Sequence, residues 1–479
     1  MTRPIENLIR GVVTQAVTRI AEFNRDHRRA DGPNPYLSGI HQPMTAEFTL
    51  TDLAVSGTIP SDLDGSYLRN GPNPVRPPNP ATHHWFTGTG MVHGVRIEGG
   101  RARWYRNRWI RGREVSEALG EPPAPGIRTE GFDAPNTNVI GHAGSLWAIV
   151  EAGGNPVRIG PELDTIAHDP FGGTLTHAFS AHPHLDPASG ELHAICYQGT
   201  VQDQVWHVVV GSDGRVRREE PIAVRHGPSI HDCMITPRWV IVLDLPVTFS
   251  MKALLAGQAF PYRWNPGHPA RVGLLPREGR GADTIWCEVE PCCVFHPANA
   301  YESDDGRVIF DACVHDRMFD GDHAGPVAQH VPFERWTLDP AARRVERAVV
   351  DAAPQEFPRI DERRTGLPYR FAYTVALPDE DNPAFVEAQQ LYKHDLAAGT
   401  RQVHDFGAGQ VPGEFVFVPR NAAAAEDDGW LMGFVIDTAR ATTDLVILDA
   451  ARFEQAPQAR ITIPHRVPPG FHGNWIAAR

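Results

Sequence analysis

Four of the 23 histidines in this chain stand out because of the residues beside them. They occur in Ala-His-Pro, Ile-His-Asp, Phe-His-Pro-Ala-Asn-Ala and Gly-Phe-His-Gly-Asn-Trp, as His182, His231, His296 and His472. Imidazole nitrogens bind zinc, copper, iron and nickel, so such a group could hold a metal ion. Neither a His-Glu-x-x-His pair nor a local Cys/His cluster strengthens this interpretation. Spacing alone leaves two possibilities: ligands that the fold brings together, or hydrogen-bonded histidines beside turns.

Ligands separated by 49, 65 and 176 residues can meet only in a fold that returns repeatedly to one axis. Short apolar runs joined by Asp/Gly turns, as at 186–190, 211–214 and 303–306, predict β-hairpins over roughly 400 residues. No long helical pattern interrupts them, which excludes a βαβ fold and favours a sandwich array or a propeller. The length suits about six to eight four-stranded blades of roughly 40–50 residues each. A propeller would let residues of distant blades meet on its axis.

Composition limits the classes of function. The net charge of −13 argues against nucleic-acid binding, which needs clustered cations. With 41% apolar residues the chain can bury a large core. None of the six cysteines forms a Cys-x-x-Cys pair, and no secretory signal pattern is present, so buried free thiols and a cytoplasmic location are expected. No apolar run is long enough to predict a membrane span.

The clearest helical pattern covers residues 4–29, where apolar side chains recur at helical spacing. Such an amphipathic helix either packs on the protein's own surface or lies in a membrane interface, although its polar face has few cations for the second role. We therefore expect a helical extension over residues 1–32 and a single β-propeller domain over residues 33–479.

Three longer motifs resemble a known family. They are Tyr67–Pro74 (YLRNGPNP), Gly90–Gly94 (GMVHG) and Gly429–Phe434 (GWLMGF). With the four histidine segments, and in the same order, they resemble the carotenoid cleavage oxygenase family from about Asn34 to Trp475. The resemblance implies an all-β, seven-bladed β-propeller with a helical and loop cap over its top face. It also implies one ferrous iron, Fe(2+), per chain on the propeller axis. The implied iron ligands are His182, His231, His296 and His472.

The same resemblance places a glutamate behind three of the ligands. A metal-binding imidazole must be neutral and correctly oriented, and a carboxylate that accepts its other N–H fixes both the tautomer and the ring plane. The implied carboxylates are Glu151, Glu356 and Glu414. Thr137 matches a family position that shields one vacant iron position. Phe295 and Phe471 each precede a ligand and are expected to line an apolar substrate cleft.

For activity, the resemblance implies that O2 cleaves one conjugated C=C bond of a hydrophobic polyene, a carotenoid or apocarotenoid, into two carbonyl products. No residue beyond the metal centre is expected to act as an acid or base. A stilbene- or phenylpropene-cleaving oxygenase of the same family is the first competing hypothesis. That branch usually has a lysine before the first glutamate, where this chain has Val150, and Trp109 likewise offers no phenolic hydroxyl. A metal-dependent polyene isomerase and a non-catalytic apocarotenoid-binding propeller are two further hypotheses.

The segment 246–264 is apolar but is interrupted by turn residues. In the family that this chain resembles, the corresponding region surrounds the mouth of the substrate tunnel and touches the membrane. A cap packed on the propeller is the competing interpretation. The expectation is a cytoplasmic protein, with peripheral membrane contact through 246–264 and the N-terminal helix as the hypothesis to test.

Overall fold

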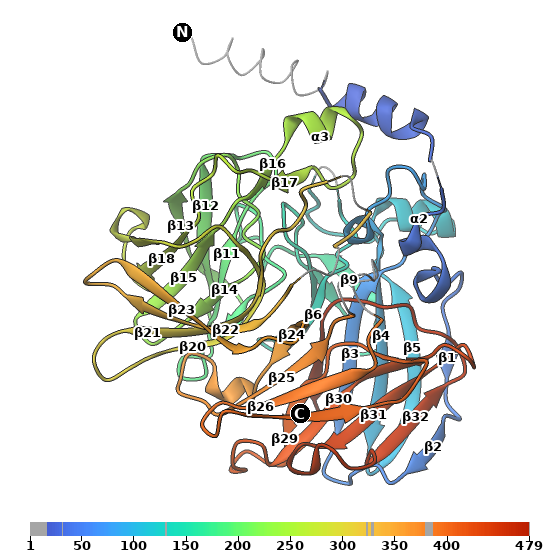
Figure 1. Cartoon of the computed structure of the whole chain (residues 1–479). Helices are drawn as coiled ribbons and strands as arrows, with labels where there is room; N and C mark the ends of the chain where they lie inside the picture. The colour runs from blue at the N-terminus through green and yellow to red at the C-terminus, as the bar shows by residue number, and fades with distance from the viewer. Residues whose placement is uncertain are drawn as a thin grey trace.

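Strands dominate the computed structural model of this chain, which describes residues 17–30, 32–129, 132–321, 324–326, 330–378 and 387–478 (Figure 1). The α-helices of these ranges are residues 17–27, α2 (Arg113–Leu119) and α3 (Met251–Leu255). Short 3-10 helices are η1 (Pro35–Leu37), η2 (Gly39–His41), η3 (Trp85–Thr87), η4 (Gly281–Asp283), η5 (Glu362–Arg364) and η6 (Ala450–Arg452). The prediction of an all-β chain is confirmed.

Consecutive strands pair antiparallel and build one sheet after another. Two four-stranded sheets contain β6 (Asn138–His142), β7 (Ser145–Ile149), β8 (Val157–Ile159) and β9 (Thr165–His168), and β10 (His184–Leu185), β11 (Leu192–Cys196), β12 (Gln204–Val210) and β13 (Val216–Ala223). An eight-stranded sheet contains β14 (Cys233–Ile235), β15 (Trp239–Asp244), β18 (Arg271–Pro276), β19 (Ile285–Glu288), β20 (Cys293–Glu302), β21 (Val308–His315), β22 (Phe333–Asp339) and β23 (Arg344–Asp351). A further four-stranded sheet contains β24 (Gln355–Arg359), β25 (Phe371–Ala376), β26 (Gln390–Asp395) and β27 (Thr400–Asp405).

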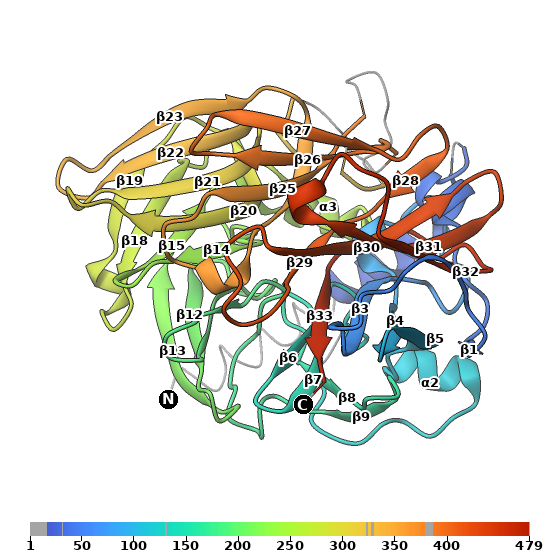
Figure 2. The same cartoon turned by 90° about the horizontal axis from the view of Figure 1, so that it is seen from below.

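Strands from the two ends of the sequence pair with each other. One sheet joins β33 (Gly473–Ala477) to β3 (Gly65–Pro72), β4 (Gly90–Glu98), β5 (Arg101–Trp109) and β1 (Thr49–Leu50). The other joins β2 (Ala54–Gly57) to β32 (Ala459–Ile463), β31 (Thr442–Asp449) and β30 (Gly429–Asp437), with β28 (Gln410–Pro412) and β29 (Val416–Pro419) beside β30. Figure 2 shows the sheets set around a common centre, so the fold is propeller-like.

The sheets pack against each other through apolar faces. Tyr67 and Val95 of one sheet contact Met432 and Ile461 of the next within one buried cluster. Strand β30 is buried along its whole length, as its continuous apolar run predicts, whereas the outer strand β23 is mostly exposed. The turns at 186–190, 211–214 and 303–306 join β10–β11, β12–β13 and β20–β21, so the predicted hairpins are confirmed.

A small cap stands on the upper face in Figure 1. It consists of α3 and the hairpin of β16 (Val247–Phe249) and β17 (Tyr262–Trp264), so most of the predicted 246–264 segment is packed on the protein. The helix of residues 17–27 lies beside α3, and the Asn24 side chain donates to the Leu255 carbonyl at 2.6 Å. Its Ile20 and Phe23 side chains are exposed, so this part of the helix does not bury its apolar face. Residues 4–16 of the predicted helix lie outside the described residues.

The described chain holds no helix that is both long and apolar enough to cross a membrane. All six cysteines are buried and free, as the sequence predicts.

Candidate metal centre

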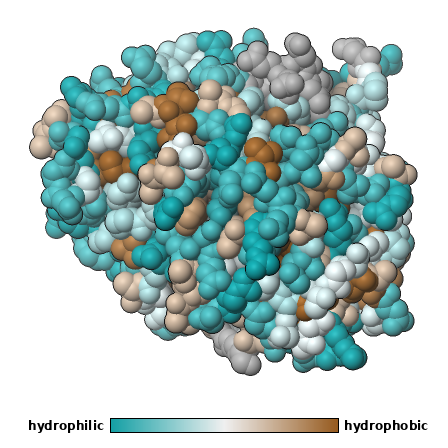
Figure 3. Space-filling model, turned by 60° about the horizontal axis from the view of Figure 1, so that its bottom comes forward, coloured by the Kyte–Doolittle hydropathy of each residue, from teal (hydrophilic) through white to brown (hydrophobic). Residues whose placement is uncertain are grey.

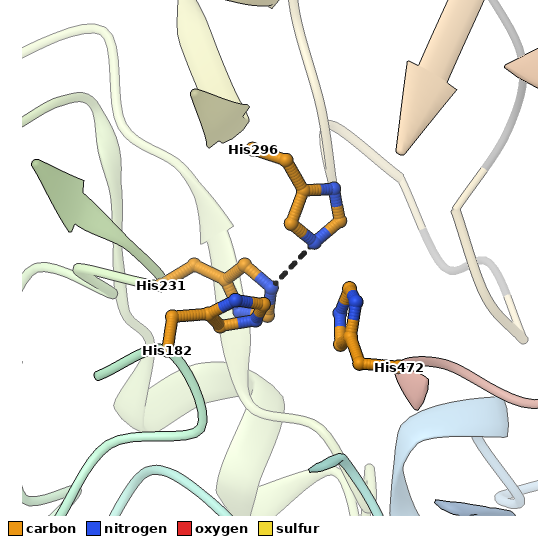
Figure 4. Close-up of side chains that lie close together, drawn as sticks. All are labelled: His182, His231, His296 and His472. Carbon is orange, nitrogen blue, oxygen red and sulfur yellow. Dashed lines mark hydrogen bonds between the residues drawn. The ribbon is translucent and has the colours of Figure 1, made fainter. Parts of the chain in front are cut away.

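The four histidines meet at one point. Each of His182, His231, His296 and His472 offers a ring nitrogen, and these atoms all lie within 4.8 Å of one another (Figure 4). The Nε2 atoms of His231 and His296 are 3.1 Å apart. The ring centroid of His182 lies 4.4 Å from those of both His231 and His472. Side chains separated by as many as 176 residues in sequence thus form one cluster that could hold a metal ion.

Edge strands bring the histidines together. His182, His231 and His472 lie just before β10, β14 and β33, and His296 lies within β20. Each of these strands is at the edge of its sheet. The pairing of β20 with β21 shifts register on both sides of Pro297, next to His296. Such an irregularity bends a strand and turns a side chain out of the regular alternation, which explains how His296 reaches the centre.

Three glutamates accept hydrogen bonds from the far side of three rings. The pairs are His231 Nδ1–Glu151 Oε2 at 2.8 Å, His296 Nδ1–Glu356 Oε2 at 2.6 Å and His472 Nδ1–Glu414 Oε1 at 3.0 Å. An ionised carboxylate only accepts, so each Nδ1 is the protonated nitrogen. These contacts fix the tautomer and the ring orientation, and they leave each Nε2 free to bind a metal.

Asp232, which the sequence analysis did not single out, occupies the corresponding place at the fourth histidine. Its Oδ2 lies 3.3 Å from His182 Nδ1, and its Oδ1 accepts from His184 Nε2 at 2.7 Å. The side chain is buried. The sequence does show an acidic residue directly after a candidate ligand, in Ile-His-Asp. Asp232 contacts His182, however, and not its sequence neighbour His231, so only the fold identifies the histidine with which it pairs.

Glu356 is held by a distorted strand. The pairing of β24 with β25 shifts register after Glu356, and the next residue, Phe357, has a φ of +53°. A bulky residue with this backbone is strained by about 1–3 kcal/mol. The Phe357 N–H donates to Glu356 Oε2 at 2.6 Å, and the buried His315 donates to Oε1 at 2.9 Å. Burial alone would raise the pKa of Glu356, but His296 and His315 hold that pKa well below its usual range.

Glu414 is held by a half-buried arginine. Arg359 lies 3.2 Å from Glu414 Oε1, and the Gly473 N–H donates to Oε2 at 3.0 Å. Burial alone would raise the pKa of Glu414, but Arg359 and His472 lower that pKa to about 2. The carboxylate is therefore ionised at neutral pH. Neither Arg359 nor His315 is a predicted site residue, because no local pattern separates them from ordinary arginines and histidines.

The donor set fits a metal ion. His182 Nε2 is buried and has no hydrogen-bond partner in the described ranges, which is the condition expected of a metal-ligand atom. Burial lowers the pKa of His182 well below its usual value, so the ring is neutral and its lone pair is available. Imidazole ligands by themselves do not choose among iron, zinc, copper and nickel.

A cavity of about 1360 Å³ adjoins the histidine cluster. Its wall includes His231, His472, Thr137, Phe295 and Phe471. The Phe295 ring lies 4.4 Å from that of His231. The Thr137 carbonyl accepts from the His472 N–H at 3.1 Å, which places this threonine beside the cluster. The volume exceeds that of most drug-sized pockets and suits a long, apolar molecule.

The sequence and the fold of this chain match one protein family. The family model described as "Retinal pigment epithelial membrane protein" matches residues 41–477. The chain belongs to that family, as its motifs predicted, and its relatives include carotenoid oxygenases and a resveratrol cleavage oxygenase. It is therefore an enzyme of the oxygenase class.

Particular relatives cover nearly the whole chain. A carotenoid cleavage oxygenase of Mycobacterium tuberculosis is 42% identical, over 93% of this chain and 98% of that protein. Among solved structures, cobalt-substituted Synechocystis apocarotenoid oxygenase is 28% identical with a TM-score of 0.82, over 94% of this chain and 100% of that one. The lignostilbene dioxygenase of Pseudomonas brassicacearum is 27% identical with a TM-score of 0.83, over the same shares.

Proposed function

We propose that this protein is a non-haem iron(II) dioxygenase that uses O2 to cleave one conjugated C=C bond of a carotenoid or apocarotenoid, giving two carbonyl products. The observation that carries the proposal is the convergence of four imidazoles, three of them oriented by glutamates, on the wall of a large cavity. The similar protein of Mycobacterium tuberculosis, named a carotenoid cleavage oxygenase, supports the same reaction.

In this proposal His182, His231, His296 and His472 bind the iron. Iron(II) would supply the electrons that O2 needs to react with an alkene, which zinc cannot do. The similar Synechocystis enzyme is described with cobalt, another divalent first-row metal that imidazole binds. Glu151, Glu356 and Glu414 fix the tautomer and the orientation of the ligand rings, and Thr137 narrows the space beside the iron.

The protein's other contribution is positioning. Phe295 and Phe471 belong to the cavity wall, and the aromatic rings of Trp85 and Phe86 pack around Phe471 at 4.7 and 5.5 Å. Apolar walls exclude water and align a polyene over the metal, which lowers the entropic part of the barrier. No side chain of the chain needs to donate or accept a proton in this reaction.

The preference for a carotenoid over a stilbene rests on one position. Val150, directly before Glu151, lines the cavity without a charge, so a phenol would find no lysine there. Trp109 donates its indole N–H to the Asn73 carbonyl at 2.8 Å and is not among the described residues that line the cavity. The similarity to a lignostilbene dioxygenase keeps stilbene cleavage as the second candidate.

We also propose that the sheets form seven blades. The eight-stranded sheet consists of two antiparallel halves, β14–β15–β18–β19 and β20–β23, which a single parallel pair, Glu288 opposite Arg344, connects. Counting these halves separately supports seven blades around the axis, with α3 and the β16–β17 hairpin as the cap and the helix of residues 17–27 as an extension.

Peripheral membrane contact through 246–264 and the N-terminal helix is part of the proposal. Ile20, Phe23 and Met251 are 49%, 61% and 45% exposed, and Val17 and Met251 also line the cavity. Apolar side chains at a cavity entrance suit a substrate that partitions into lipid. The face seen in Figure 3, with the bottom of the molecule brought forward, is by contrast largely hydrophilic.

Product analysis tests the proposed reaction. Iron-loaded protein is incubated in air with carotenoids, apocarotenals and hydroxystilbenes, and products are identified by mass. Two carbonyl fragments from a polyene support the proposal, and fragments from stilbenes alone support the second candidate. Rearranged polyene of unchanged mass would indicate an isomerase, and bound, unchanged polyene would indicate a binding protein.

A further inference from the structure

A tyrosine in the cavity wall has a buried hydroxyl group without a partner. Tyr262, on β17, is 3% exposed, and its hydroxyl oxygen has no hydrogen-bond partner among the described residues. The same residue lines the cavity beside the histidine cluster. A buried, unpaired hydroxyl costs about 1–3 kcal/mol, so proteins seldom keep one without a reason.

Other buried tyrosines are satisfied within the protein. Tyr373 donates to Asp427 and Tyr36 to the Pro326 carbonyl, both at 2.7 Å, and the partly buried Tyr369 donates to Asp311 at 2.7 Å. The neighbour of Tyr262 in the cavity wall, Tyr197, accepts from the Ser229 hydroxyl at 3.1 Å. The unpaired state of Tyr262 is therefore a property of its place in the wall and not of buried tyrosines in general.

Aromatic rings hold the Tyr262 ring in place, and a glycine lies beside its hydroxyl. The rings of Phe260, Tyr197 and Phe249 pack around it at 5.2, 5.8 and 6.1 Å. The hydroxyl faces Gly199, which also lines the cavity, and a Cβ atom there would lie 3.4 Å from the hydroxyl oxygen. Gly199 has no side chain, so it places neither an apolar nor a polar group opposite the Tyr262 hydroxyl.

We propose that Tyr262 is a specificity-determining residue whose hydroxyl donates a hydrogen bond to an oxygen atom, a hydroxyl or a carbonyl, of the bound substrate. The proposal rests on the proposed function, and it narrows the substrate class from hydrocarbon polyenes to oxygenated ones. A tyrosine hydroxyl with its ordinary pKa of about 10 keeps its proton at physiological pH, so the Tyr262 hydroxyl can act as a donor. Burial and then the nearby Glu151 carboxylate raise the pKa of Tyr262 further.

Substrate pairs of one carbon skeleton, with and without oxygen, test the inference. Suitable pairs are a ring-hydroxylated carotenoid and its hydrocarbon, an apocarotenal and its hydrocarbon, and 4-hydroxystilbene and stilbene. Dissociation constants are measured by quenching of tryptophan fluorescence without O2, and kcat/KM is measured in air. We expect the wild type to prefer the oxygenated member of at least one pair by about 10-fold, and Tyr262→Phe to abolish that preference. An unchanged preference in every pair, as a bound water opposite Tyr262 would produce, would overturn the inference.

Tyr369→Phe is the matched control, because its hydroxyl is satisfied by Asp311 and it does not line the cavity. We expect Tyr369→Phe to lower the melting temperature and leave the substrate preference unchanged. Tyr262→Phe removes an unpaired hydroxyl, so we expect no loss of melting temperature; a clear decrease would show that the hydroxyl has a structural partner.

Absence of cleavage of every polyene by the wild type would refute the proposed function, whereas cleavage without a Tyr262-dependent preference would refute only this inference.

Discussion

An imidazole can bind a metal through one nitrogen only if the other nitrogen carries the proton. In this chain a carboxylate determines which nitrogen that is for three histidines, and Asp232 lies beside the fourth. The arrangement accounts for buried acidic residues that would otherwise destabilise the fold. It also makes specific predictions for single substitutions.

Replacing His296 by alanine removes one ligand and leaves the strand in place. We expect loss of iron and loss of polyene cleavage, while the β-rich circular dichroism spectrum is kept. His394→Ala removes an equally buried histidine outside the site and should retain iron. Iron analysis of both purified variants checks this, and full activity of His296→Ala would contradict the ligand assignment.

Glu356→Gln keeps the size of the side chain but removes its charge. The Glu356 oxygens accept from His296 and His315, so we expect iron affinity or turnover to fall about 10–100-fold. Glu334→Gln is the control, because Glu334 is a buried carboxylate that pairs with Arg347 away from the site. Iron affinity and turnover equal to those of the wild type would refute the role given to Glu356.

Asp232→Asn tests the residue that the sequence did not single out. We expect the Fe(II) dissociation constant, measured by competition with a chelator, to rise about 10–100-fold because His182 loses its anionic partner. Asp244→Asn removes a buried aspartate that binds His268 instead and should leave the dissociation constant unchanged. Equal behaviour of the two variants would mean that Asp232 has only a structural role.

Among the structural elements, the sequence predicts those that depend on a few neighbouring residues, such as hairpins. The Asp/Gly turns predict the hairpins, since these residues adopt the backbone that the turns require. Pairing of β2 with β32 could not be predicted, because Ala54 and Thr462 meet only after the ring closes. The irregular β24 that directs Glu356 inward was also unpredictable, because register depends on the partner strand. The family motifs, not local physics, suggested the four histidines and three glutamates as a set.

The cap and the helix of residues 17–27 leave several apolar side chains exposed, so packing on the protein does not explain these residues. If Ile20, Phe23 and Met251 enter a lipid surface, the triple change to serine should weaken co-sedimentation with liposomes at least about 10-fold. Val349 and Val350, 57% and 39% exposed on β23, provide the matched control when changed to serine. Equal liposome binding by both variants would contradict membrane contact through this element.

For the whole molecule, buried neutral histidines make stability depend on pH. Burial lowers the pKa of His394 to about 4, whereas the unfolded value is near 6.5. Between these two pH values the unfolded state binds more protons than the folded state. The contribution of His394 to the free energy of unfolding is therefore fully present above about pH 6.5 and decreases as the pH falls toward 4. From this residue alone we expect a loss of about 2 kcal/mol between pH 7.5 and pH 5.

Urea unfolding at the two pH values checks this prediction. His394→Gln can still donate to Gln355 but cannot titrate, so its loss between pH 7.5 and pH 5 should be smaller than that of the wild type. The same pH dependence in wild type and variant would mean that His394 is not buried in its neutral form.

The central claim is that the four-histidine centre uses O2 to cleave a polyene. The most direct measurement is cleavage of a polyene by iron-loaded protein under ¹⁸O₂, with rapid reduction of the products to alcohols and mass analysis of both fragments. We predict one labelled oxygen atom in each fragment, and no cleavage by protein stripped of its metal. Label in only one fragment would contradict a dioxygenase, and cleavage by the metal-free protein would contradict the centre itself.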